Sequence, residues 1–125
     1  MSKQRVRRVV IADDDPDMRM VLRELLAGLG VEVAEAVNGG DLAVLLADGR
    51  PLDLLITDVR MPWATGMQVS TAARHAGMTM PVIVITAFGD DRLRDAVEHL
   101  GSATLLSKPF KPEDLLSLAR SLLQA

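Results

Sequence analysis

The sequence predicts an α/β fold, a doubly wound parallel sheet of five strands flanked by five helices. Short β-branched runs alternate with amphipathic stretches along the whole chain, which is typical of βαβ units. Several of those runs, such as 82–86, are continuously apolar, which predicts strands that are buried on both faces. The chain has 125 residues, of which 49% are hydrophobic and 2% aromatic. We therefore expect a single domain over residues 1–125 with an aliphatic core.

The first half of the chain carries clear start and stop signals. Asp15 is an expected N-cap and Pro16 the first residue of the helix that follows it. Gly30 is expected to end that helix, and Asn38 to cap the next one. The predicted elements are a strand at 6–12, a helix at 16–29, a strand at 31–36, a helix from 39 to about 48, and a strand at 52–57.

The second half continues the alternation. Pro81 opens a strand, Gly101 stops a helix, and Lys111 is a poor capping residue at the start of the last helix. The predicted elements are a helix at 66–76, a strand at 82–86, a helix from Asp90 or Asp91 to Leu100, a strand at 103–107, and a helix from Pro112. Parallel strands joined by right-handed crossovers need helices on both faces of the sheet. At this size the common strand order is the flavodoxin-like 2-1-3-4-5.

Composition excludes several classes of protein. There are no cysteines, which excludes disulfides, thiol catalysis and zinc–cysteine sites. The apolar run after the basic N-terminus stops at Asp13, too early for a signal peptide or a membrane span. We therefore expect a cytoplasmic protein that does not contact membrane. The net charge of −3 does not favour nucleic acid as a partner.

Polar residues follow four of the predicted strands. Asp13 and Asp14 follow the first strand, Asp58 the third and Lys108 the fifth, while Thr86 ends the fourth. The carboxyl ends of parallel strands share one edge, where open α/β sheets bind ligands. Three carboxylates at close range repel one another unless a cation neutralises them. Hard oxygen ligands of this kind suit Mg²⁺.

The same edge offers groups that suit a phosphoryl group. Lys108 supplies a compact positive charge, and the Thr86 hydroxyl and the Ala87 backbone N–H supply donors. Asp58 lies at the centre of the predicted cleft, so its carboxylate is the candidate nucleophile. Taken singly, an Asp pair, a strand-end Thr and a Lys–Pro step are ordinary turn and loop features. Their coincidence at four strand ends favours a functional site.

Four segments resemble those of bacterial response-regulator receiver domains, and together they extend over nearly the whole chain. They are 9–16 (VVIADDDP), 54–62 (LLITDVRMP) followed by Gly66, 84–87 (VITA) and 107–110 (SKPF). The resemblance implies that Asp58 accepts a phosphoryl group from a sensor histidine kinase or a histidine phosphotransfer protein. The chain would act as a Mg²⁺-dependent switch or relay in two-component signalling toward a downstream output domain or protein. It would not be an enzyme beyond catalysing its own phosphorylation and self-dephosphorylation.

The resemblance also implies roles for individual residues. Asp14 and Asp58 would ligate Mg²⁺, with Asp13 acting through a bound water and the Arg60 backbone carbonyl completing the protein ligands. Thr86 and Lys108 would bind the phosphoryl oxygens. A cis peptide bond is implied before Pro109.

One position departs from the family pattern. Receivers commonly carry Tyr or Phe three residues before the lysine, where this chain has Leu105. In the family that ring moves with the threonine. Thr86 and Leu105 therefore form the expected switch, and because Leu105 has no ring, we expect its output step to differ from the family's. Arg60 and Phe88 are expected to fringe the site entrance and to tune the phosphate lifetime. Trp63, in the loop after Asp58, is expected to report on the site by its fluorescence.

There are three alternative functions. A small aspartate-nucleophile phosphatase would need a cap domain and a second acid at Arg60, two residues after Asp58. A flavin-binding module would need glycine, serine or threonine in the acidic turn 13–16. A degenerate receiver that binds partners without phosphorylation stays open because of Leu105, as does the question whether the chain acts alone or within a longer regulator.

Overall fold

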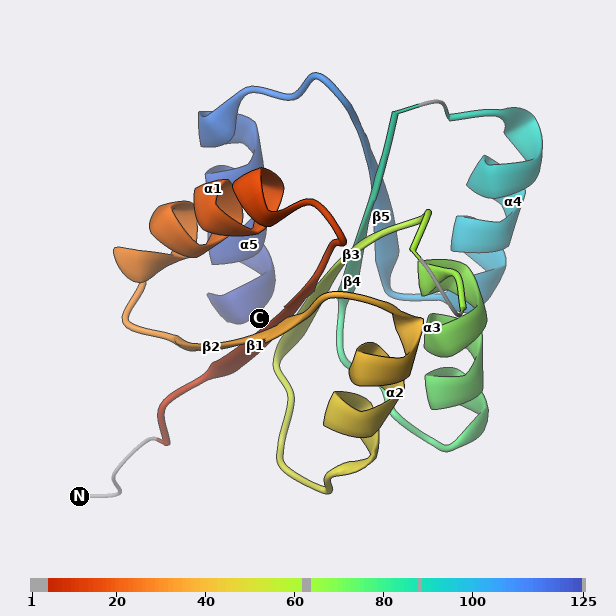
Figure 1. Ribbon diagram of the computed structural model, residues 1–125, viewed down its shortest axis with the longest axis horizontal. Coiled ribbons are helices and arrows are strands. Elements are labelled where there is room, and N and C mark those ends of the chain that lie inside the picture. Colours follow the sequence, from red (N-terminus) through yellow and green to blue (C-terminus); the bar gives the residue numbers. More distant parts are fainter. Residues whose placement is uncertain (1–4, 62–63, 88, 125) are drawn as a thin grey trace.

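The computed structural model describes residues 5–61, 64–87 and 89–124 (Figure 1). Strands and helices alternate strictly over these residues, in the order that the sequence predicts. They are β1 (Arg8–Ala12), α1 (Pro16–Ala27), β2 (Glu32–Ala36), α2 (Gly39–Ala47), β3 (Leu54–Asp58), α3 (Gly66–His75), β4 (Val82–Thr86), α4 (Asp91–Leu100), β5 (Ala103–Ser107) and α5 (Pro112–Gln124).

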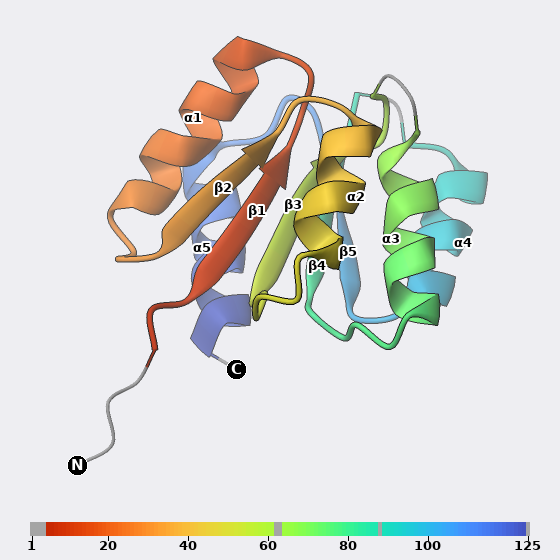
Figure 2. The same ribbon diagram turned by 60° about the horizontal axis from the view of Figure 1, so that its bottom comes forward.

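The strands form one parallel sheet in the order β2-β1-β3-β4-β5, which confirms the predicted topology. Helices α1 and α5 cover one face, and α2, α3 and α4 cover the other (Figures 1 and 2). Side chains alternate between the two faces along each strand, so Val9 and Ile11 pack with α1 and α5 while Val10 packs with the three helices opposite. Both cores are aliphatic, as the composition predicts.

Local signals in the sequence account for most helix starts. The Asp15 side chain accepts a hydrogen bond from the N–H of Asp17 at 2.9 Å, and Asn38 caps α2 through Asp41 in the same way. Asp90, one of the two predicted choices, is the N-cap of α4. At α5 the first turn is closed by backbone instead, since the N–H of Asp114 donates to the Lys111 carbonyl at 3.0 Å. The poor capping residue is therefore tolerated.

Three predicted boundaries were wrong by two residues. Strand β1 begins at Arg8 rather than at Val6, because pairing with β2 starts at Arg8 and the Val6 side chain is exposed. Strand β3 begins at Leu54 because the carboxylate of Asp53 turns back to accept the Arg8 N–H at 2.8 Å. Helix α1 ends at Ala27 because Gly28, not Gly30, is its C-cap.

Two further features bear on the predictions. The peptide bond between Lys108 and Pro109 is cis, as the family resemblance implies. Within the described part of the chain, no helix has the length and apolar character needed to cross a membrane.

Candidate functional site

The sheet brings the predicted site residues to one edge, formed by the carboxyl ends of its strands (Figure 2). Asp13 directly follows β1, and its N–H donates to the Ala36 carbonyl at 3.1 Å. Asp58 is the last residue of β3 and Thr86 the last of β4. Lys108 directly follows β5, and its N–H donates to the Thr86 carbonyl at 2.7 Å. The backbone of the site is thus an extension of the strand ladders.

Three carboxylates form a tight acidic cluster at this edge. Asp13, Asp14 and Asp58 each place one carboxylate oxygen within 4.8 Å of the others. The Lys108 Nζ lies 3.5 Å from Asp58 Oδ2 and 4.0 Å from Asp13 Oδ2. One ammonium group therefore lies close to two of the three carboxyl groups, which leaves negative charge on the cluster for a further cation to neutralise.

Asp13 is the buried member of the cluster, and burial makes its ionised form unfavourable. Its side chain is only 1% exposed, and Oδ1 accepts the Asp15 N–H at 2.9 Å. Its Oδ2 is buried and has no hydrogen-bond partner among the described residues. Burial raises the pKa of Asp13 to about 6; the Asp15 N–H opposes this rise, and the negative charge of Asp58 adds to it.

This donor set fits a hard divalent cation. Mg²⁺ prefers carboxylate oxygens and carbonyls and retains several waters, so an exposed edge with two or three carboxylates suits it. Asp14 is exposed and Asp58 half-buried, which leaves room for those waters. The buried, unpartnered Asp13 Oδ2 is an oxygen that a metal-bound water would satisfy.

The remaining predicted residues surround the cluster. The Arg60 N–H donates to Asp58 Oδ1 at 3.3 Å, so the Arg60 peptide lies beside the central aspartate while its side chain is exposed. Thr86 is buried and interacts within the protein, and Ala87 after it is exposed. The ligand roles of the Arg60 carbonyl, Thr86 and the Ala87 N–H stay predictions.

Leu105 lies on β5 opposite Val84 of β4 and packs, half-buried, against the core beneath α4. At this position the family commonly has an aromatic ring, and here an aliphatic side chain takes its place in the packing. Phe88 and Trp63, for which the sequence suggested roles in phosphate lifetime and fluorescence, lie outside the described residues.

The sequence did not reveal one residue that contacts the backbone beside the cluster. Arg19 of α1 donates from Nη1 to the backbone carbonyl of Asp13 at 2.8 Å. The amphipathic pattern of α1 predicts which residues form its apolar stripe but not what the residues of its polar face contact. A cation in the first turns of a helix is electrostatically unfavourable, and that anomaly was the available signal.

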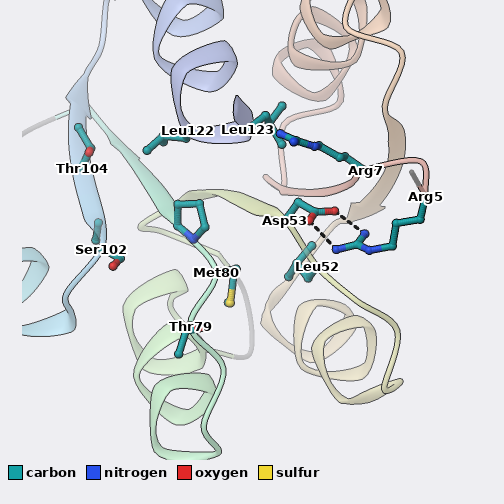
Figure 3. A pocket seen from close by; sticks show the side chains of 12 residues that line it. Arg5, Arg7, Leu52, Asp53, Thr79, Met80, Ser102, Thr104, Leu122 and Leu123 are labelled. Carbon is teal, nitrogen blue, oxygen red and sulfur yellow. Dashed lines mark hydrogen bonds and ion pairs between the residues drawn. The ribbon is translucent and has the colours of Figure 1, made fainter. Parts of the chain in front are cut away.

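A second cavity lies at the opposite edge of the sheet, where the strands begin (Figure 3). It has a volume of about 830 Å³, and its lining includes Arg5, Asp53, Pro81 and Leu123. Both oxygens of the Asp53 carboxylate are occupied by Arg5, each at 2.7 Å. Among the described residues that line this cavity, the one carboxylate is therefore paired with arginine, whereas the acidic cluster brings three carboxylates together.

The comparisons with known proteins agree with this geometry. The family model for the response regulator receiver domain matches residues 9–120. The response regulator MprA of Mycobacterium sp. (strain KMS) is 36% identical over 117 residues, which are 94% of this chain and 50% of that protein. The chain thus spans about half the length of the curated relatives it matches.

Solved structures give the same answer. The chemotaxis protein CheY4 of Vibrio cholerae superposes with a TM-score of 0.84 at 27% identity, covering 95% of this chain and all of that one (100%). A CheY-like receiver domain from Methanospirillum hungatei JF-1 has a TM-score of 0.88 at 22% identity, covering 96% of this chain and 95% of that one, and supports the fold alone. With its parallel sheet, its acidic cluster and a family match over nearly its whole length, the chain belongs to the response regulator receiver domain family of two-component signalling.

Proposed function

We propose that residues 1–125 form a single receiver domain in which Asp58 accepts a phosphoryl group and switches the surface that a downstream partner recognises. The observation that carries this proposal is the position of Lys108. Its Nζ lies 3.5 Å from Asp58 Oδ2, at the rim of a three-carboxylate cluster. A carboxylate beside a fixed cation and a cation-binding edge is suited to phosphoryl transfer, which depends on positioning and charge neutralisation.

In the proposed reaction a carboxylate oxygen of Asp58 attacks the phosphorus of a phosphohistidine. A phosphorus–oxygen bond forms as the phosphorus–nitrogen bond breaks, and the imidazole nitrogen keeps the bonding pair and takes up a proton from solvent. The Lys108 ammonium compensates charge on the phosphoryl oxygens, and the Thr86 hydroxyl and the Ala87 N–H are the proposed donors to them.

Mg²⁺ is the proposed cofactor. Asp14, Asp58 and the Arg60 carbonyl would hold it, with Asp13 binding through a water. When bound, it would supply charge neutralisation for the acidic cluster and the phosphoryl oxygens.

The proposed donor is a sensor histidine kinase or a histidine phosphotransfer protein. It has to reach Asp58 from the strand-end edge, and an apolar groove of about 500 Å³ borders that edge beside Lys108. The groove lies between α1 and the loop before α5 and is lined by Met18, Val21, Lys108, Pro109, Phe110 and Pro112. Apolar surface next to the reacting group is suited to docking the helices that carry a phosphohistidine.

The output step is proposed to run through Thr86 and Leu105. Movement of the threonine toward the phosphoryl group would let Leu105 repack beneath α4. Because leucine has no ring or hydroxyl to present at the surface, the signal would consist of the changed packing of α4 and β5 alone.

Intact mass tests the proposal. The protein is incubated with acetyl phosphate with and without Mg²⁺, alongside Asp58→Asn and, as a matched control, Asp95→Asn on the exposed side of α4. We expect one added phosphoryl group in the wild type and in Asp95→Asn, and none in Asp58→Asn or without Mg²⁺. An adduct on Asp58→Asn would overturn the assignment. No adduct on any protein would favour a receiver fold that binds partners without phosphorylation.

A further inference from the structure

Arg19 occupies an unusual place for a cation. It is the fourth residue of α1, close to the N-terminal end of the helix, where the helix dipole and unpaired N–H groups disfavour positive charge. Its side chain is nevertheless only 17% exposed. A cation that is largely buried needs anions or hydrogen-bond acceptors around it. The groups that Arg19 contacts therefore indicate what it does.

The Arg19 guanidinium joins two parts of the fold that flank the acidic cluster. Nη1 donates to the Asp13 carbonyl at 2.8 Å, and Nε lies 3.3 Å from Oε1 of Glu35 on β2. The other Glu35 oxygen is 2.7 Å from Nη1 of Arg23, whose side chain is 48% exposed. Arg23 therefore shares the same anion as Arg19, but within the described part of the chain it makes no hydrogen bond or ion pair with Asp13.

The carbonyl that Arg19 holds belongs to the peptide between Asp13 and Asp14. That peptide is planar, so fixing its carbonyl fixes the direction in which the chain enters Asp14. The Asp13 N–H is held by Ala36 at 3.1 Å, and Asp13 Oδ1 by the Asp15 N–H at 2.9 Å. The Arg19 contact supplies a further restraint on this turn, and it comes from a side chain that takes no part in the cluster.

We propose that Arg19 is a positioning residue that orients the Asp13–Asp14 pair for divalent-cation binding. This inference rests on the proposed function, which assigns Mg²⁺ to that pair. Mutation of a residue that hydrogen-bonds to a metal ligand typically lowers metal affinity by about 10- to 100-fold. We therefore expect Arg19→Ala to weaken Mg²⁺ binding about tenfold.

The direction of the change separates positioning from simple charge. If Arg19 acted only as a nearby positive charge, its removal would reduce repulsion of Mg²⁺ and tighten binding. A residue that merely stabilised the fold would lower the free energy of unfolding and leave the affinity of the folded protein unchanged. Weaker Mg²⁺ binding by a folded variant is expected only if Arg19 orients the ligands.

The experiment is a MgCl₂ titration followed by amide ¹H–¹⁵N chemical shifts, which report both folding and the dissociation constant. Arg23→Ala is the matched control, because it removes the other arginine that pairs with Glu35, at a more exposed position. We expect this variant to bind Mg²⁺ as tightly as the wild type. Arg19→Lys, which keeps the charge and one donor group, is expected to bind with an affinity between wild type and Arg19→Ala.

Glu35→Gln keeps the inference testable if Arg19→Ala fails to fold. It removes the anion that anchors Nε of Arg19 and is expected to weaken binding in the same direction, by less. The inference would be overturned if Arg19→Ala bound Mg²⁺ as tightly as the wild type or more tightly. If Arg19→Ala does not fold, the same result in Glu35→Gln would overturn it.

Asp14→Asn separates the role of Arg19 from the proposed function. If neither the wild type nor this variant responds to Mg²⁺, the proposed function fails and the role of Arg19 fails with it. If the wild type and Arg19→Ala bind Mg²⁺ equally well, only the role of Arg19 is overturned.

Discussion

The Asp13 carboxyl group is expected to destabilise the metal-free fold at neutral pH, and Asp13→Asn should relieve this. The group is 1% exposed, and its Oδ2 has no hydrogen-bond partner within the described chain. Lys108 Nζ lies 4.0 Å away, beyond hydrogen-bonding distance. An amide at this position carries no charge, can still accept the Asp15 N–H, and offers a donor to the neighbouring carboxylates.

The size of the effect follows from the pKa of Asp13, which burial raises from 3.8 to about 6. At about 1.4 kcal/mol per pKa unit, this difference corresponds to about 3 kcal/mol of destabilisation when the group is ionised. Because the folded protein binds the proton more tightly than the unfolded chain, the destabilisation is complete above pH 6 and absent below pH 3.8. We expect Asp13→Asn to gain about 1 to 3 kcal/mol at pH 7.5, less than the full value if the new amide lacks a partner.

Urea unfolding in EDTA at pH 7.5 and at pH 4.5 measures this effect. The variant should be more stable than the wild type at pH 7.5, and the gap should narrow at pH 4.5, where Asp13 is mostly protonated. Saturating Mg²⁺ should stabilise the wild type and reduce its difference from the variant, because ligand binding favours the folded state. A variant that is no more stable than the wild type at pH 7.5 in EDTA would show that ionisation of the buried Asp13 does not destabilise the fold.

Other perturbations probe the fold around the site. Gly66→Ala should cost about 1 to 3 kcal/mol in thermal unfolding, because a Cβ there would meet the side chain of Thr57 and the backbone beside it; an unchanged Tm would contradict this close approach. Leu115→Ala, at a fully buried position of α5, should cost about 2 to 5 kcal/mol in urea, and a loss well below that range would mean that the α1–α5 core collapses to fill the space. Asp53→Asn should lower stability by about 1 kcal/mol at pH 7, since Arg5 holds the pKa of Asp53 below its usual value. That loss should vanish as the pH falls below the pKa of Asp53 in the folded protein, and a loss of equal size at low pH would show that charge is not its cause.

The sequence predicts the fold well because each element carries its own signals. The continuously apolar strands, the caps at Asp15, Asn38 and Asp90, and the strict alternation leave few arrangements other than a doubly wound sheet. The boundary errors arise where tertiary contacts override local preference. Asp53 reads as part of a strand, but its carboxylate accepts the Arg8 N–H and pairs with Arg5.

The clustering of the three aspartates and Lys108 was predictable from the sequence, and the electrostatics of the cluster were less so. Parallel topology alone places Asp13, Asp58 and Lys108 at one edge, so their clustering follows from strand order. The burial of Asp13 and its unpartnered oxygen depend on tertiary packing, which no short motif specifies. The contact of Arg19 with the Asp13 carbonyl is hidden for the same reason, because it joins a helix side chain to a backbone atom.

The most direct test of the central proposal is to locate the phosphoryl group. The protein is phosphorylated with acetyl phosphate and Mg²⁺, treated with borohydride, which reduces an acyl phosphate to an alcohol, and digested for peptide mass mapping. We expect homoserine at position 58 and unmodified aspartate at positions 13 and 14. Reduction at either of those two residues, or at no aspartate while the protein carries phosphate, would contradict the assignment of Asp58 as the phosphoacceptor.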